Sequence, residues 1–177
     1  MLNFHDSSMY AAARGRVTSL RWRLLIGALF AVGAAFVLDS VQIGLGWFLA
    51  LALSMGFDAM LGHSYLEARG QTQRRNAGVM FVWGCIFSIM IFAAMPIILA
   101  AWGAGPGRVL GVLMAASSLV SVMLFFFQAP RFMLMCSAPA IIALLAIPFV
   151  PSGASQADAM QEAVGAACGV AGFLAYI

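Results

Sequence analysis

Residues 78–101 read GVMFVWGCIFSIMIFAAMPIILAA, a run of 24 residues without a charged side chain. A helix needs about 20 residues, at a rise of about 1.5 Å each, to cross the roughly 30 Å of hydrocarbon in a bilayer. This stretch is therefore long enough to span a membrane. Pro96 predicts a kink toward its end, because proline cannot donate a backbone hydrogen bond within a helix.

Further apolar runs lie on both sides of this segment. Asp39-Ser40 separates the first two runs, and the glycine-rich Trp102–Gly107 and the segment Gln128–Arg131 separate later ones. We expect an all-α, polytopic membrane protein with six transmembrane helices after an N-terminal segment at residues 1–22. The spans are predicted near residues 23–39, 41–61, 78–101, 109–127, 132–150 and 160–177.

The composition supports the same class of protein. The chain has 177 residues, of which 64% are hydrophobic and 8% charged, and its mean hydropathy is +1.01. An ordinary soluble domain is about 25% charged. This composition excludes a secreted disulfide module, a nucleic-acid-binding domain and a soluble enzyme. Cys85, Cys136 and Cys168 lie far apart without ligand spacing, so we interpret them as small buried residues and expect no metal or cofactor.

The arginines predict the orientation of the chain. All nine basic residues are arginine, which is typical of a GC-rich bacterial genome, and basic residues favour the cytoplasmic side of a membrane. If six helices alternate, only Arg108 lies on the outer side. Both termini are then cytoplasmic, in the inner membrane of a bacterium. The anchors of this topology are Arg21, Arg23, Arg69, Arg74, Arg75 and Arg131.

The two ends of the chain leave alternatives open. Residues 14–36 have some features of a signal peptide, but the preceding polar stretch is long and further spans follow directly. Residues 1–20 could form a short surface helix or a disordered cytoplasmic segment. The sequence stops at Ile177 within an apolar run. We therefore expect a piece of a longer protein that continues in the cytoplasm.

A few polar residues near the cytoplasmic ends of the spans are candidates for function. Asp58 lies in the last part of the second span, where it could pair with Arg131 or Arg23, or form a proton or ligand site. His63 and Glu67 are four residues apart, so they share a face if the helix continues. A histidine beside a carboxylate can respond to pH, although such pairs are commonly only solvated surface.

Small and hydroxylated residues suggest further sites of contact. Gly165, Gly169 and Gly172 form a small-residue face on the sixth span, which permits close packing within the chain or in a homodimer. Ser117, Ser118 and Ser121 could line a small pocket or simply bond to the backbone.

The segment Phe125-Phe126-Phe127-Gln128-Ala129-Pro130-Arg131-Phe132, followed by Ser137-Ala138-Pro139, carries a family resemblance. It resembles the turn between the fourth and fifth helices of the membrane-embedded sensor region of alphaproteobacterial six-helix sensor histidine kinases. The resemblance covers roughly residues 20–177. It implies a homodimeric input domain that passes a bilayer or extracytoplasmic stimulus to a cytoplasmic module beyond residue 177, either a histidine kinase or a diguanylate cyclase.

Two other classes of function remain possible on the sequence. A six-helix transport subunit or carrier fragment has a similar length, although carriers tend to have broken helices and polar groups near the midplane. A structural scaffold is the third class. The sequence contains no phosphoacceptor helix, ATP-binding motif or hydrolase motif, so any enzymatic activity would lie beyond Ile177.

Overall fold

The computed structural model describes residues 7–127 and 129–150. This part of the chain is all-α and contains no strand. Its elements are six α-helices and a short 3₁₀ helix: α1 (Ser7–Thr18), α2 (Leu20–Val37), α3 (Val41–Glu67), α4 (Gln71–Trp102), α5 (Ala104–Phe126), α6 (Pro130–Ala146) and η1 (Ile147–Phe149).

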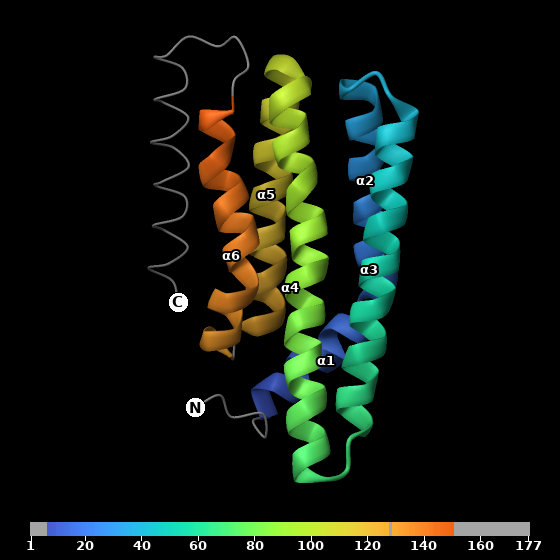
Figure 1. The fold of residues 1–177 in the computed structure, drawn as a ribbon, viewed down its shortest axis with the longest axis vertical. Helices are drawn as coiled ribbons and strands as arrows, with labels where there is room; N and C mark the ends of the chain where they lie inside the picture. Colours follow the sequence, from blue (N-terminus) through green and yellow to red (C-terminus); the bar gives the residue numbers. More distant parts are fainter. Residues whose placement is uncertain (1–6, 128, 151–177) are drawn as a thin grey trace.

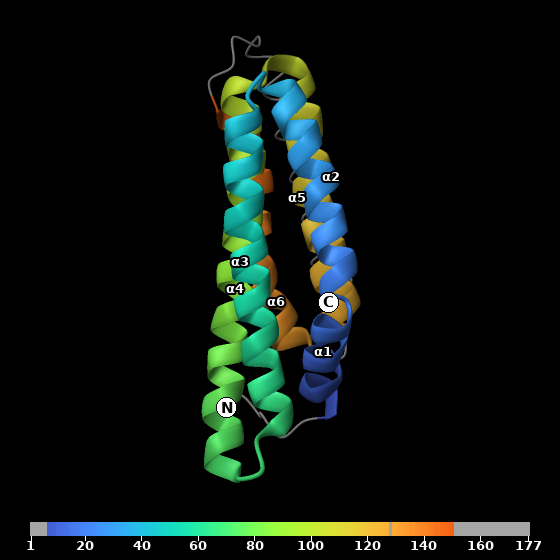
Figure 2. The ribbon, with the colours of Figure 1, turned by 90° about the vertical axis from the view of Figure 1, so that its right-hand side faces the viewer.

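The five longer helices run side by side along the long axis of the molecule, and α1 lies at one end of them (Figures 1 and 2). Within the described residues, five segments are long and apolar enough to cross a membrane: Leu20–Val37, Val41–Glu67, Gln71–Trp102, Gly105–Phe126 and Pro130–Phe149. The all-α prediction is confirmed, and the helices are compatible with a multi-pass membrane protein. The predicted sixth span, 160–177, lies outside the described residues.

A tight turn joins α2 and α3. Asp39 has a positive φ of 49°, a conformation that aspartate tolerates better than most residues. Ser40 then caps α3, because its side chain accepts a hydrogen bond from the backbone N–H of Ile43 at 3.4 Å. This turn brings Gly44 against α2, where an added Cβ would lie 2.7 Å from the carbonyl oxygen of Ala31. The two helices therefore cross in close contact.

Buried apolar side chains form two clusters in the described part of the bundle. One cluster lies toward the α2–α3 turn and contains residues of α2, α3, α4 and α5. Trp47 belongs to it: its ring packs against Phe92, and its Nε1 donates to the carbonyl oxygen of Ile91 at 2.8 Å. The other cluster joins α1, α3, α4, α5 and α6, and it includes Tyr65 stacked on Phe81.

Residues 7–18 form a helix that packs into the protein. The sequence left residues 1–20 open between a surface helix and a disordered segment. In α1, Met9, Ala12 and Ala13 are at most 2% exposed, and the helix contacts α3 and α5. Small side chains let α1 approach its neighbours closely, so its apolar face is covered by the bundle.

We predict that the α2–α3 crossing depends on the missing side chain at Gly44. Gly44→Ala should lower the apparent Tm of the purified chain in detergent, because the new Cβ meets a backbone carbonyl and forces a shift that costs about 1–3 kcal/mol. Gly46→Ala is the matched control, since nothing lies within 4 Å of its Cβ position. That variant should be neutral or stabilising by up to about 1 kcal/mol. Equal Tm values for the two variants would contradict the close crossing.

Candidate functional site

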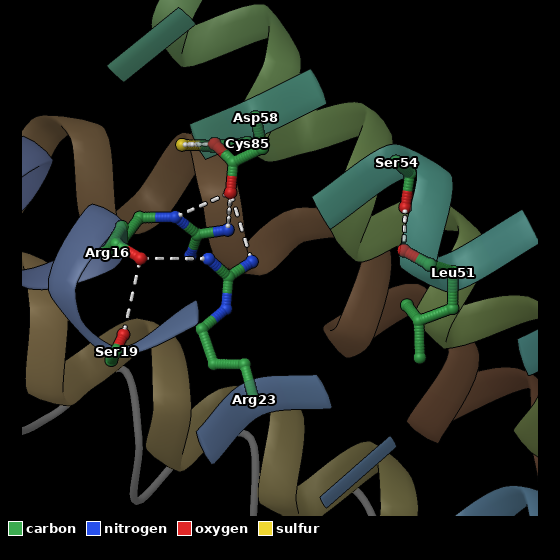
Figure 3. A network of polar contacts seen from close by, with 7 residues as sticks. All are labelled: Arg16, Ser19, Arg23, Leu51, Ser54, Asp58 and Cys85. Atoms are coloured by element: carbon green, nitrogen blue, oxygen red, sulfur yellow. Dashed lines mark hydrogen bonds and ion pairs between the residues drawn. The ribbon is translucent and has the colours of Figure 1, made fainter. Parts of the chain in front are cut away.

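A buried carboxylate lies where α1 meets the longer helices. Asp58 of α3 is 0% exposed, and its Oδ2 atom is shared by two arginines (Figure 3). Arg16 of α1 donates to it from Nε at 3.1 Å and from Nη2 at 2.7 Å. Arg23 of α2 donates from Nη2 at 3.0 Å. One carboxylate oxygen therefore joins three helices.

A fourth helix contributes through Cys85 of α4, whose thiol donates to Oδ1 of Asp58 at 3.1 Å. Arg23 also reaches back to α1, where its Nη1 donates to the carbonyl oxygen of Arg16 at 3.4 Å. We call Arg16, Arg23, Asp58 and Cys85 the buried ion cluster. Cys85 is thus a polar partner as well as a small buried residue.

The helix geometry explains why these side chains meet. Arg16 and Arg23 are seven residues apart, or about two helical turns, so they face the same way across the short break at Ser19. Asp58 lies about 25 Å along α3 from Val41, at a rise of about 1.5 Å per residue. In a bilayer with about 30 Å of hydrocarbon, the cluster would lie near one edge of the apolar layer.

The buried ion cluster carries an excess of positive charge. Two guanidinium groups face one carboxylate, which leaves a formal charge of +1 among groups no more than 8% exposed. Rings of Phe125 and Phe126, each 5.8 Å from Cζ of Arg16, add cation–π stabilisation. Burial by itself lowers the pKa of Arg16, but the attraction of the Asp58 carboxylate and the hydrogen bonds to it outweigh this effect. The pKa of Arg16 therefore lies above its ordinary value.

A cavity of about 540 Å³ adjoins the buried ion cluster. Arg16 and Arg23 line one end of it, and apolar side chains of α2, α4 and α5 line most of the rest. Five serines also line it: Ser19, Ser88, Ser117, Ser118 and Ser121. The sequence left two interpretations of the α5 serines open, a pocket lining and a bond to the backbone. Ser117 fits both, because it lines the cavity and its hydroxyl donates to the carbonyl oxygen of Leu113 at 2.7 Å.

The residues that the sequence analysis singled out lie at different places in the structure. Asp58 pairs with Arg23, one of the two partners considered for it. His63 and Glu67 lie in the last turns of α3, where Nδ1 of His63 is 3.3 Å from Oε1 of Glu67, and their side chains are 63% and 71% exposed. This pair is apart from the buried ion cluster, and its role in sensing stays a prediction. Gly165, Gly169 and Gly172 lie outside the described residues.

The predicted anchor arginines have different environments. Arg21, Arg69, Arg75 and Arg131 are exposed, whereas Arg23 belongs to the buried ion cluster. Arg74 lies half-buried, with its Cζ 5.9 Å from the ring centre of Tyr10 and 5.6 Å from that of Tyr65. Arg74 therefore helps to hold α1 against α3 and α4.

Arg16 was not singled out by the sequence analysis. Its place among the basic residues near the start of the chain is typical of a topology anchor. The seven-residue spacing from Arg23 was a usable signal, but it required α1 to be helical. The twelve residues of α1, SSMYAAARGRVT, contain too few large apolar side chains to predict a packed helix.

No family model, no curated protein and no solved structure matches the chain. The assignment of a function therefore rests on the geometry of the buried ion cluster and its surroundings. Among residues 7–127 and 129–150, no three His, Cys, Asp or Glu side chains gather where they could hold a metal ion. The arrangement is suited to holding helices in register and to attracting an anion.

We predict that the Asp58 carboxylate is essential to the folded state. Asp58→Asn should lower the free energy of unfolding by about 3–5 kcal/mol, because two buried guanidinium groups lose their counter-charge. Glu67→Gln, on the same helix but in an exposed pair, should change it by less than about 1 kcal/mol. Thermal unfolding of both variants in detergent tests this. A similar Tm for Asp58→Asn and the wild type would show that the cluster is not structural.

Proposed function

We propose that the chain is a membrane-embedded sensor region, and that α1 is the element through which a change among the spans reaches the cytoplasmic side. The observation that carries this proposal is the contact between Arg16 and Asp58. It links a helix outside the set of candidate spans to α3, and Arg23 of α2 and Cys85 of α4 bind the same carboxylate. A shift of α2, α3 or α4 would alter the position of α1.

The balance of charges allows this link to act as a two-state element. Asp58 can keep one arginine if the other leaves, because Arg16 and Arg23 share the same carboxylate oxygen. Losing one partner would leave a neutral pair rather than an isolated charge. The cost of releasing α1 is therefore smaller than the cost of breaking a single buried ion pair.

The resemblance to six-helix sensor kinases supports the cytoplasmic direction of this signal. In this proposal both termini lie in the cytoplasm, the protein is a homodimer in the bacterial inner membrane, and a kinase or cyclase module follows residue 177. The exposed His63–Glu67 pair, close to the same end, is a second candidate for sensing pH.

Transport is the alternative, and the cavity is the feature that favours it. Four of the five candidate spans of the described chain are single helices and the fifth is α6 continued by η1, although α4 and α6 contain Pro96 and Pro139. The cavity runs from Arg16 only as far as Phe30 on α2 and Leu113 on α5, near the middle of both helices. It does not extend to the α2–α3 turn. The candidate spans that line the cavity, α2 to α5, are each continuous, and this feature favours a sensor over a carrier built from broken helices.

Reading the coding sequence beyond codon 177 is the first test of the sensor proposal. We expect a soluble helix with a phosphoacceptor histidine followed by an ATP-binding domain, or a diguanylate cyclase module. Output activity of the full-length protein can then be measured in lipid nanodiscs. A stop codon or a further set of apolar spans would contradict the proposal and make transport the leading hypothesis.

We predict that Arg16→Gln changes the basal output of the full-length protein by about fivefold or more, which corresponds to about 1 kcal/mol of coupling. The variant keeps the Arg23–Asp58 pair and should fold. Arg14→Gln removes an exposed arginine from the same helix and should leave the output unchanged. An unaltered output in folded Arg16→Gln would exclude α1 as the coupling element.

A further inference from the structure

The cavity beside the buried ion cluster has the chemistry of a binding site for an amphipathic anion. We propose that it holds an anionic phospholipid of the leaflet on the α1 side, with its phosphate at Arg16 and Arg23 and one acyl chain along α2 and α5. This proposal stands on the cavity and its charges, and it does not require the chain to be a sensor.

The charge at the arginine-lined end of the cavity selects an anion. Within the part of the chain that the structure describes, Asp58 is the one carboxylate that contacts the two arginines, so a formal charge of +1 remains beside the cavity. A buried charge without a partner is costly in an apolar layer. A bound headgroup with one negative charge would balance it. The planar guanidinium group suits phosphate, which it can bind through two parallel hydrogen bonds.

The shape of the cavity suits an acyl chain. Its lining on α5 extends from Phe125 to Leu113, about 18 Å at 1.5 Å per residue. Apolar side chains, including Phe30 and Phe92, line its far end. The volume of about 540 Å³ falls within the roughly 300–1,000 Å³ that is usual for small-molecule sites.

The cavity opens at the outside of the bundle, which would face hydrocarbon in a membrane, and this opening indicates where the ligand comes from. Several lining residues are also exposed on the outside of the bundle: Trp22 at 69%, Leu113 at 56% and Leu124 at 69%. Their side chains mark an entrance between α2 and α5. A molecule already in the bilayer can enter sideways, with its headgroup at the level of the arginines near the edge of the apolar layer. A diacyl phospholipid satisfies this geometry with one chain inside and the other in the membrane.

The site can be tested with the full chain purified in a mild detergent. Native mass spectrometry would count bound lipid during titration with phosphatidylglycerol and, separately, with phosphatidylcholine of the same acyl chains. We expect phosphatidylglycerol to bind about tenfold more tightly. Arg23→Gln should reduce this preference to about twofold or less, because it removes the excess charge and leaves the Arg16–Asp58 pair. Arg21→Gln, an exposed arginine on the same helix, should retain the preference.

A second pair of variants tests the acyl-chain channel without touching the charges. Ala116→Phe places a ring in the cavity and should lower the occupancy of phosphatidylglycerol several-fold. Ala50→Phe, on an exposed position of α3 that does not line the cavity, should have no effect. Gel filtration and the helical circular dichroism signal would confirm that each variant is folded.

Three results would overturn the proposal. The first is equal binding of the two phospholipids by the wild-type chain. The second is an equal loss of preference in Arg21→Gln and Arg23→Gln, which would indicate a general attraction to the surface. The third is tight binding of oleate with weak binding of phosphatidylglycerol, which would assign the cavity to a single-chain carboxylate instead.

Discussion

The shared carboxylate of Asp58 is the contact on which the rest of this structure depends. A charged group within an apolar bundle is tolerated only when it is paired and hydrogen-bonded. Here the pairing is spread over four helices, because Arg16, Arg23 and Cys85 each reach Asp58 from a different element. The position of α1, the register of α2 against α3 and the charge beside the cavity all follow from this arrangement.

The packing around the buried ion cluster explains how a largely apolar chain specifies one arrangement. Lipid-facing apolar residues do not distinguish one helix rotation from another, since either face is compatible with hydrocarbon. Close contacts between helices and polar contacts do distinguish one rotation from another. Gly44 fixes the crossing of α2 and α3, and Trp47 fixes α3 against α4 through the carbonyl of Ile91. The cluster adds a third constraint at the other end of the bundle.

Sequence reasoning predicted the features that depend on length and local chemistry. The uncharged run at residues 78–101 was sufficient to predict a spanning helix, and Asp39 marked the turn between the first two. Asp58 was recognised as an unusual charge, with Arg23 among its possible partners. Arg16 was missed because its role depends on α1, a short helix stabilised by burial of Met9, Ala12 and Ala13 against other helices rather than by its own sequence pattern. The cavity also depends on the relative positions of α2 and α5, which no local pattern encodes.

The Arg16–Asp58 ion pair holds α1 against the longer helices together with the buried side chains of Met9, Ala12 and Ala13, and amide hydrogen exchange in lipid nanodiscs tests the part played by the ion pair most directly. In the wild-type chain, the amides of residues 7–18 should be protected. In Arg16→Gln, they should exchange much faster, while α3 and α4 keep their protection through the remaining Arg23–Asp58 pair. Protection of α1 that is the same in both proteins would contradict the central role of the shared carboxylate.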